Sequence, residues 1–118
     1  MKVQNYLDVK GLNAAPGVTM HIVAGTAEKA PTFVMRVFEI EPGCNTPHHA
    51  HPWEHEMFII KGQGTLKSGS TEKALKEGDA VMVLPDEQHG VFNTGKSLLT
   101  MICVVPLVNG QMPGMPKQ

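Results

Sequence analysis

Chain breakers divide this sequence into short segments, which leaves little room for long helices. Glycine and proline contribute 12 and 9 of the 118 residues. Between them lie apolar runs that are rich in Val, Ile and Phe and bounded by turn residues, as is typical of strands. The clearest runs are 32–40, 57–61, 80–84 and 98–105. Many short strands with closely spaced turns favour an antiparallel sandwich or barrel, so we predict an all-β fold in which 13–29 is loop with one short strand.

The composition limits the class of protein and its partners. A chain of 118 residues and 12.8 kDa is the usual size of one domain. The formal net charge of -1 argues against nucleic acid or an anionic membrane surface as the main partner. No apolar run approaches the roughly 20 residues of a membrane span, and the first twenty residues lack the layout of a secretory signal. Two cysteines cannot form a disulfide scaffold. We expect a soluble, cytoplasmic, single-domain protein with a small-molecule partner.

The histidines are concentrated in one part of the chain. Four of the six lie within eight residues, at His48, His49, His51 and His55, and a fifth is His89. Residues i and i+2 of a strand point to the same face, so His49 and His51 project side by side, and His55 keeps that parity if the strand is regular. Neutral imidazole is the commonest protein ligand of transition metals. The pattern therefore predicts a metal site, with His48 on the opposite face.

Two segments around these histidines resemble the two signatures of the cupins. From residue 43 the chain reads G-C-N-T-P-H-H-A-H-P-W-E-H-E-M-F-I-I-K-G. This is similar to a glycine, five residues, H-x-H, three or four residues, a glutamate, six residues and a glycine. From residue 78 it reads G-D-A-V-M-V-L-P-D-E-Q-H-G-V-F-N, similar to the second signature. In that segment the proline lies one step late, and Asp86 stands where a glycine is usual.

The resemblance implies a fold and a domain layout. Cupins have a six-stranded antiparallel β-barrel core with additional strands, the jelly-roll-like double-stranded β-helix, with the metal inside, and they are commonly homodimers. For this chain the resemblance implies a cupin domain over 1–118, with its barrel core at about 32–105. The segment 1–31 would supply an N-terminal strand or loop. The segment 106–118 would be a mobile tail or a strap on a partner subunit.

One departure from the first signature affects the ligand set. Counting back six residues from Gly62, the position of the family's glutamate holds His55. Glu56 is the alternative, because the looser spacing accommodates it, but it lies on the opposite face of a regular strand. The sequence thus looks like the small single-domain bacterial cupins that bind manganese through four histidines. The ligands predicted on this basis are His49, His51, His55 and His89.

Four neutral ligands would leave the charge of a divalent ion uncompensated. Such a centre attracts carboxylates, enolates or peroxide, and a six-coordinate ion would keep two open positions. Zinc would be saturated by four histidines and would have no open position for catalysis. The resemblance favours manganese, followed by iron, while nickel, copper and zinc are alternatives because affinity alone does not select the ion.

Parity also predicts which side chains line the cavity. Arg36 points inward on the run 32–40 and would hold a substrate carboxylate, or else it is a rim residue with a solvated head. Met57, Met101 and Cys103 also point inward, and they are compatible with ordinary core packing. Trp53 lies in the break between ligands and caps the cavity mouth or packs at its rim.

Three functions are compatible with such a site. The first is a metal-dependent oxygenase or oxidase that uses the vacant positions for substrate and dioxygen. The second is a Lewis-acid lyase, decarboxylase or isomerase, which needs no change of oxidation state. The third is a non-catalytic binding or sensing module. We rank the oxygenase first, as a family-level expectation, because one fold hosts many chemistries.

Overall fold

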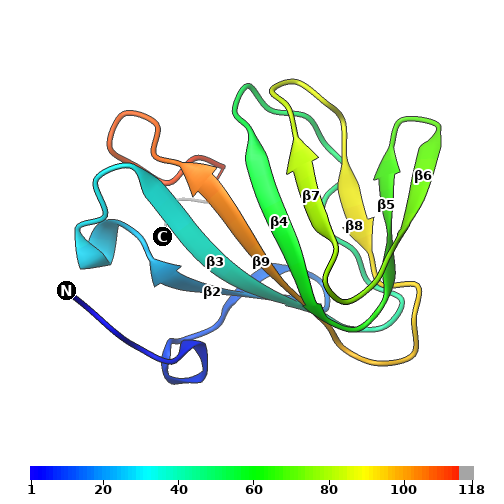
Figure 1. Ribbon diagram of the computed structural model, residues 1–118, viewed down its shortest axis with the longest axis horizontal. Coiled ribbons are helices and arrows are strands. Elements are labelled where there is room, and N and C mark those ends of the chain that lie inside the picture. Colours follow the sequence, from blue (N-terminus) through cyan, green and yellow to red (C-terminus); the bar gives the residue numbers. More distant parts are fainter. Residues whose placement is uncertain (115–118) are drawn as a thin grey trace.

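The computed structural model describes residues 1–114 and has an all-β, jelly-roll architecture, which confirms the predicted fold class. Within these residues, nine strands form two antiparallel sheets, ordered β1-β2-β3-β9-β4-β7 and β6-β5-β8 (Figure 1). The bounds are β1 Leu12–Ala15, β2 Val18–Ala24, β3 Phe33–Ile40, β4 His55–Lys61, β5 Gly64–Ser68, β6 Thr71–Leu75, β7 Ala80–Val83, β8 Gly90–Phe92 and β9 Leu99–Pro106. Two 3-10 turns, Tyr6–Asp8 and Thr26–Glu28, complete the regular structure, and no helix among the described residues is long and apolar enough to cross a membrane.

Alternation along the strands of the larger sheet builds the interior. On β3, Val34 and Ile40 are fully buried while Phe33 is 63% exposed, so successive residues face opposite sides. The inward set continues across the neighbouring β9 and β4 through residues that pair in register. The largest fully buried side chains of the core are Ile40, Ile59, Leu99, Met101, Val18, Val34, Val91 and Val105. Burying one such side chain contributes about 1.5–3 kcal/mol to stability.

The four predicted strands are confirmed, whereas the prediction for 13–29 was wrong. That segment forms most of a hairpin, β1 and β2, which turns at Gly17 with φ +71°. β2 then pairs with β3 along almost its whole length. Its sequence V-T-M-H-I-V-A alternates apolar and polar residues, so the period of a half-buried strand was present but too short to separate from the surrounding loop.

The C-terminal segment folds back onto its own barrel. Leu107 and Met112 pack against the core, and Pro113 and Gly114 line the main cavity. Residues 115–118 of the predicted tail lie outside the described residues. The described part of the segment after β9 therefore forms part of the wall of the site.

Candidate metal centre

Backbone pairing brings the two histidine-bearing segments together. The His49 N–H donates to the carbonyl of His89 at 3.0 Å, and the His89 N–H donates to the carbonyl of His49 at 2.9 Å. Directly opposed residues of an antiparallel pair project to the same face. The N–H of Asp86 donates to the carbonyl of His51 at 2.7 Å, and Asp86 adopts a left-handed φ of +69°. Aspartate tolerates this conformation, which explains how it replaces the usual glycine of the second signature.

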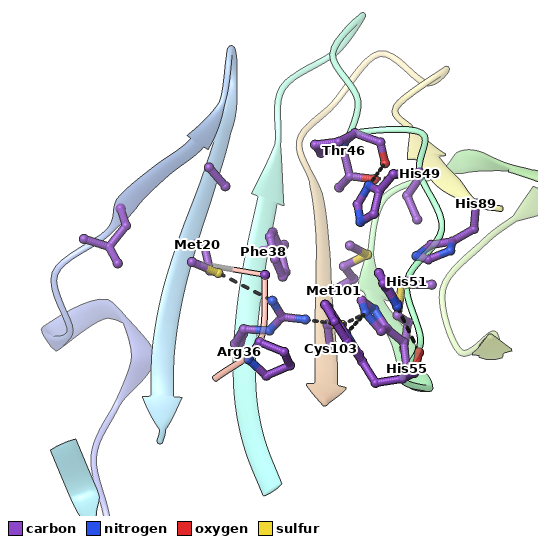
Figure 2. Close-up of a pocket in the computed structure, with 18 of the residues that line it drawn as sticks. Met20, Arg36, Phe38, Thr46, His49, His51, His55, His89, Met101 and Cys103 are labelled. Carbon is purple, nitrogen blue, oxygen red and sulfur yellow. Dashed lines mark hydrogen bonds between the residues drawn. The ribbon is translucent and has the colours of Figure 1, made fainter. Parts of the chain in front are cut away.

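Three of the predicted ligands converge at one end of the barrel. The ligand nitrogens of His49, His51 and His89 lie within 4.8 Å of one another, and Figure 2 shows their rings turned toward a common point. The His49 and His89 ring centroids are 5.3 Å apart, and those of His51 and His89 are 4.9 Å apart. His51 and His89 are buried, while His49 is exposed at the mouth.

Hydrogen bonds determine the tautomer of all three rings. Each Nδ1 lies at hydrogen-bond distance from a backbone carbonyl two residues away in the chain. The acceptors are the carbonyls of Pro47 for His49, Trp53 for His51 and Glu87 for His89, at 2.8, 2.9 and 2.9 Å. A carbonyl can only accept, so in each neutral ring Nδ1 carries the proton and Nε2 keeps its lone pair. Histidines that bind a metal through one ring nitrogen usually donate the N–H of the other nitrogen in this way.

The residues present fit a divalent transition metal. The Nε2 atom of His51 is buried and has no hydrogen-bond partner, and a buried acceptor without a partner costs about 1–3 kcal/mol. Burial also lowers the pKa of His51 and of His89, so both rings are neutral at physiological pH. A metal ion would satisfy the orphaned lone pair, and neutral imidazole is the form that binds it.

His55 lies beside this cluster with its lone pair engaged. It points inward from the start of β4, opposite Val83, as the parity predicted. Its Nε2 accepts a hydrogen bond from the indole N–H of Trp53 at 3.3 Å. Its ring stacks on His51 at 4.2 Å and 15°, and the in-plane lone pairs of near-parallel rings do not converge. Burial, reinforced by the charge of Arg36, lowers the pKa of His55 to about 3.

The remaining candidates from the histidine region lie outside the cavity. Glu56 is exposed on the outer face of β4, where it pairs with Met82 of β7 and Val104 of β9. It therefore does not point toward the histidines. His48 is also exposed, with its ring edge-on to Phe92 at 6.3 Å between centroids.

The histidines close one end of a cavity of about 300 Å³ with mainly apolar walls. All of the sequence-predicted wall residues line it: Arg36, Trp53, Met57, Met101 and Cys103. Phe38, which shares a face of β3 with Arg36, also lines the cavity. Sequence reasoning missed Leu12, Met20 and Val91, which contribute further apolar surface. The alternation on β2 was the available signal for Met20. Trp53 stacks on His51 with centroids 4.3 Å apart, so it forms part of the wall at the metal end.

A second polar group lies in the cavity wall beside His55. Cys103 Sγ is 3.3 Å from the Nδ1 atom of His55, and the guanidinium of Arg36 donates to the same sulfur at 2.9 Å (Figure 2). Burial raises the pKa of the Cys103 thiol, so it is neutral. Register explains the contact, because Arg36 and Cys103 are directly paired on β3 and β9.

Comparison with known proteins identifies the family. Residues 36–105, more than half of the chain, match the Cupin domain family. This chain is a cupin. Among characterised relatives, the oxalate-binding protein of Thermotoga maritima is 25% identical over 89 residues, which cover 75% of this cupin and 74% of that protein.

Solved structures agree on the fold. The polyketide cyclase RemF from Streptomyces resistomycificus is 28% identical, with a TM-score of 0.83 over 90% of this cupin and 79% of that chain. A predicted oxalate decarboxylase from Thermotoga maritima is 19% identical, with a TM-score of 0.76 over 91% of this cupin and 100% of that chain. At 19% identity, the similarity to the predicted oxalate decarboxylase shows only that the two chains share a fold.

Proposed function

We propose that this cupin is a metal-dependent enzyme whose ion, held by His49, His51 and His89, binds a small anionic or enolic substrate in the apolar cavity. The observation that carries the proposal is the orphaned Nε2 of His51, beside two imidazoles whose Nδ1 protons are also committed to carbonyls. Because all three ligands are neutral, an oxygen anion is the natural partner of the ion. When bound, the ion would supply Lewis acidity toward a coordinated oxygen.

We further propose His55 as a fourth ligand, after its ring turns away from Trp53. Two observations support this: its inward position on β4 and its ring centroid 5.1 Å from that of His89. Manganese remains the proposed ion on the family resemblance, with iron, nickel, copper and zinc as alternatives. While His55 is engaged by Trp53, three histidines would leave even a four-coordinate zinc ion with an open position.

For the reaction, we favour Lewis-acid chemistry over the oxygenase that the sequence ranked first. Two of the proteins that this cupin resembles in sequence are named as an oxalate-binding protein and a polyketide cyclase, and neither name describes an oxygenase. The cavity supports an enolic or oxo-acid substrate, since Arg36 and the histidines line it among mainly apolar walls. The chain's own residues would exclude water there and hold the substrate against the ion. A metal-dependent oxygenase remains the second candidate, because the histidine set also suits redox-active ions.

We also propose a homodimer formed through the outer face of the larger sheet. Exposed apolar side chains from three of its strands support this, namely Phe33 and Met35 of β3, Phe58 of β4 and Met82 of β7, with exposed fractions of 63%, 41%, 46% and 62%. Several large apolar side chains exposed on one face of a sheet are typical of an association surface.

The metal site is tested by elemental analysis of protein reconstituted with Mn²⁺. We expect one ion per chain in the wild type and in Glu56→Ala, little or no metal in His51→Ala, and weaker binding in His55→Ala. The two alanine variants at neighbouring positions are a matched pair, because only one of the two side chains points inward. Metal loss in Glu56→Ala but not in His55→Ala would contradict the ligand assignment, and full loading of His51→Ala would refute the site itself.

The reaction class is tested without knowledge of the natural substrate. Proton NMR in D₂O would follow deuterium exchange next to the carbonyl in a panel of 2-oxo acids and 1,3-diketones, without oxygen. We expect exchange with the manganese-loaded and the zinc-loaded protein, because a Lewis acid need not change oxidation state. The same panel would also be incubated in air, where turnover that requires dioxygen and fails with zinc would instead assign the oxygenase reaction.

A further inference from the structure

The cavity wall contains a buried cation, Arg36, which forms no ion pair within residues 1–114. Arg36 points inward from the middle of β3 and is only 7% exposed. This burial excludes the alternative of a rim arginine with a solvated head. Charged side chains are rarely buried unless they are paired, so the surroundings of this guanidinium call for an explanation.

The contacts of Arg36 satisfy it poorly. One terminal nitrogen donates to Met20 Sδ at 3.9 Å and the other to Cys103 Sγ at 2.9 Å (Figure 2). The guanidinium carbon lies 5.0 Å from the Phe38 ring centroid. Its Nε is buried without any partner. The salt bridges within residues 1–114 join other residues, so no carboxylate of the described chain neutralises this charge.

Guanidinium groups pair best with carboxylates, through parallel N–H donors. Sulfur atoms are weak acceptors, and an unpaired buried charge is costly. A carboxylate entering the cavity would exchange these weak contacts for strong ones. The wall thus carries a preformed site for an anionic group.

The position of Arg36 indicates what else such a ligand contains. The Cys103 sulfur that accepts from Arg36 also lies 3.3 Å from Nδ1 of His55. The guanidinium of Arg36 and the ring of His55 therefore flank a single sulfur atom, and the ring of His55 stacks on that of His51 with centroids 4.2 Å apart. A carboxylate at Arg36 would thus lie on the side of the cavity where these histidines are, so the oxygen that reaches the ion would be close to the carboxylate in the ligand.

We infer that Arg36 binds the carboxylate of a 2-oxo or 2-hydroxy acid whose neighbouring oxygen binds the ion, and that the apolar walls receive a branched or aromatic substituent of that acid. The inference rests on the proposed function, since it names the substrate class of the same site. The substituent follows from the shape of the cavity: about 300 Å³ exceeds what oxalate fills, and the walls near Arg36 include Phe38 and Met101.

The test compares 4-methyl-2-oxopentanoate with its methyl ester, which keeps the 2-oxo group and the side chain but lacks the negative charge. Isothermal titration calorimetry would measure both probes on the full-length manganese-loaded protein and on the metal-free protein, with metal content determined in each sample. Arg36→Met keeps the length and apolar stem, Arg36→Lys keeps the charge, and Lys67→Met, which removes a surface cation over Phe92, is the matched control.

We expect Arg36→Met to bind the acid about tenfold to a hundredfold more weakly, because charged hydrogen bonds contribute about 1.5–3 kcal/mol. The ester affinity should be unchanged, Arg36→Lys should be intermediate, and Lys67→Met should match the wild type. Metal-free wild type should still prefer the acid, since Arg36 is then the cation in the wall. That preference needs no variant, so it tests the inference even if Arg36→Met does not fold.

Two results would overturn the assignment. One is an equal loss of acid and ester affinity in Arg36→Met, which would assign Arg36 a purely structural role. The other is metal-free wild type that binds acid and ester alike. A protein that takes up no metal but retains the acid preference would refute the proposed metal-dependent function while supporting the role of Arg36.

Discussion

At the scale of residues, the histidines differ in where their protons are held. His49, His51 and His89 each commit the Nδ1 proton to a carbonyl, which leaves the lone pair of Nε2 facing the site. His55 instead accepts the indole proton of Trp53 on Nε2. The histidines therefore differ in how readily they can bind a metal, because their hydrogen-bond partners differ.

The lowered pKa values predict how stability depends on pH in the metal-free protein. His55 has a pKa of about 3 when folded, against an ordinary value of 6.5, so between these values the unfolded chain binds a proton that the folded chain does not. The free energy of unfolding should therefore fall as the pH drops below 6.5. Each such histidine contributes a slope of about 1.4 kcal/mol per pH unit.

Urea unfolding at a series of pH values down to about pH 5 would measure this slope. We expect His55→Gln to reduce this slope by up to about 1.4 kcal/mol per pH unit, the contribution of one proton. A His55→Gln variant whose stability falls as steeply as that of the wild type would show that His55 is protonated in the folded state.

At the scale of elements, the turn between β4 and β5 depends on a glycine. Gly62 adopts φ +93°, and a Cβ there would lie 2.6 Å from the carbonyl oxygen of Leu98. We expect Gly62→Ala to destabilise the fold by about 2–4 kcal/mol, because both the conformation and the backbone clash oppose a side chain. Gly43→Ala is the control, since φ is +80° but the space around it is open, and it should cost about 1–2 kcal/mol. If urea unfolding gave equal losses of the free energy of unfolding for the two variants, the close approach of the Leu98 carbonyl to Gly62 would contribute nothing.

Some of the strands could be predicted from the sequence and others could not. Strands such as β3 and β9 were recognisable because apolar residues fill them, and parity correctly turned Arg36 and Cys103 inward. β5 and β6 read G-T-L-K-S and T-E-K-A-L, so they are strands because they pair with each other and carry no strong signal of their own. The bond between Trp53 and His55 depends on a loop conformation that no periodic pattern encodes.

For the whole molecule, much of the outer face of the larger sheet is left uncovered by the part of the chain that the structure describes, residues 1–114. The N-terminal segment packs against one part of this face, where the ring of Tyr6 lies edge-on to that of His21. Nδ1 of His21 lies 2.8 Å from the carbonyl oxygen of Val9, and Nε2 of His21 lies 3.2 Å from the carboxylate of Glu39. Farther along, registered pairs place Phe58 beside Ile102, and Met82 beside Glu56. Phe58 and Met82 are 46% and 62% exposed. Such a face is energetically unfavourable in water, and a second copy of the chain offers a matching apolar surface.

We therefore predict that Phe58→Glu weakens self-association of this cupin at least tenfold, because the new carboxylate would be buried against apolar side chains of the second copy. Light scattering coupled to size-exclusion chromatography, over a range of protein concentrations, would measure the mass. Thr71→Glu on β6, an exposed position of the other sheet, should leave the dimer intact. A wild type that stays monomeric at high concentration would refute the dimer, and a Phe58→Glu protein that remains dimeric would place the interface elsewhere. Metal content in the same fractions would report whether the centre needs the second subunit, and since every predicted ligand comes from one chain, we expect the monomeric variant to retain its ion.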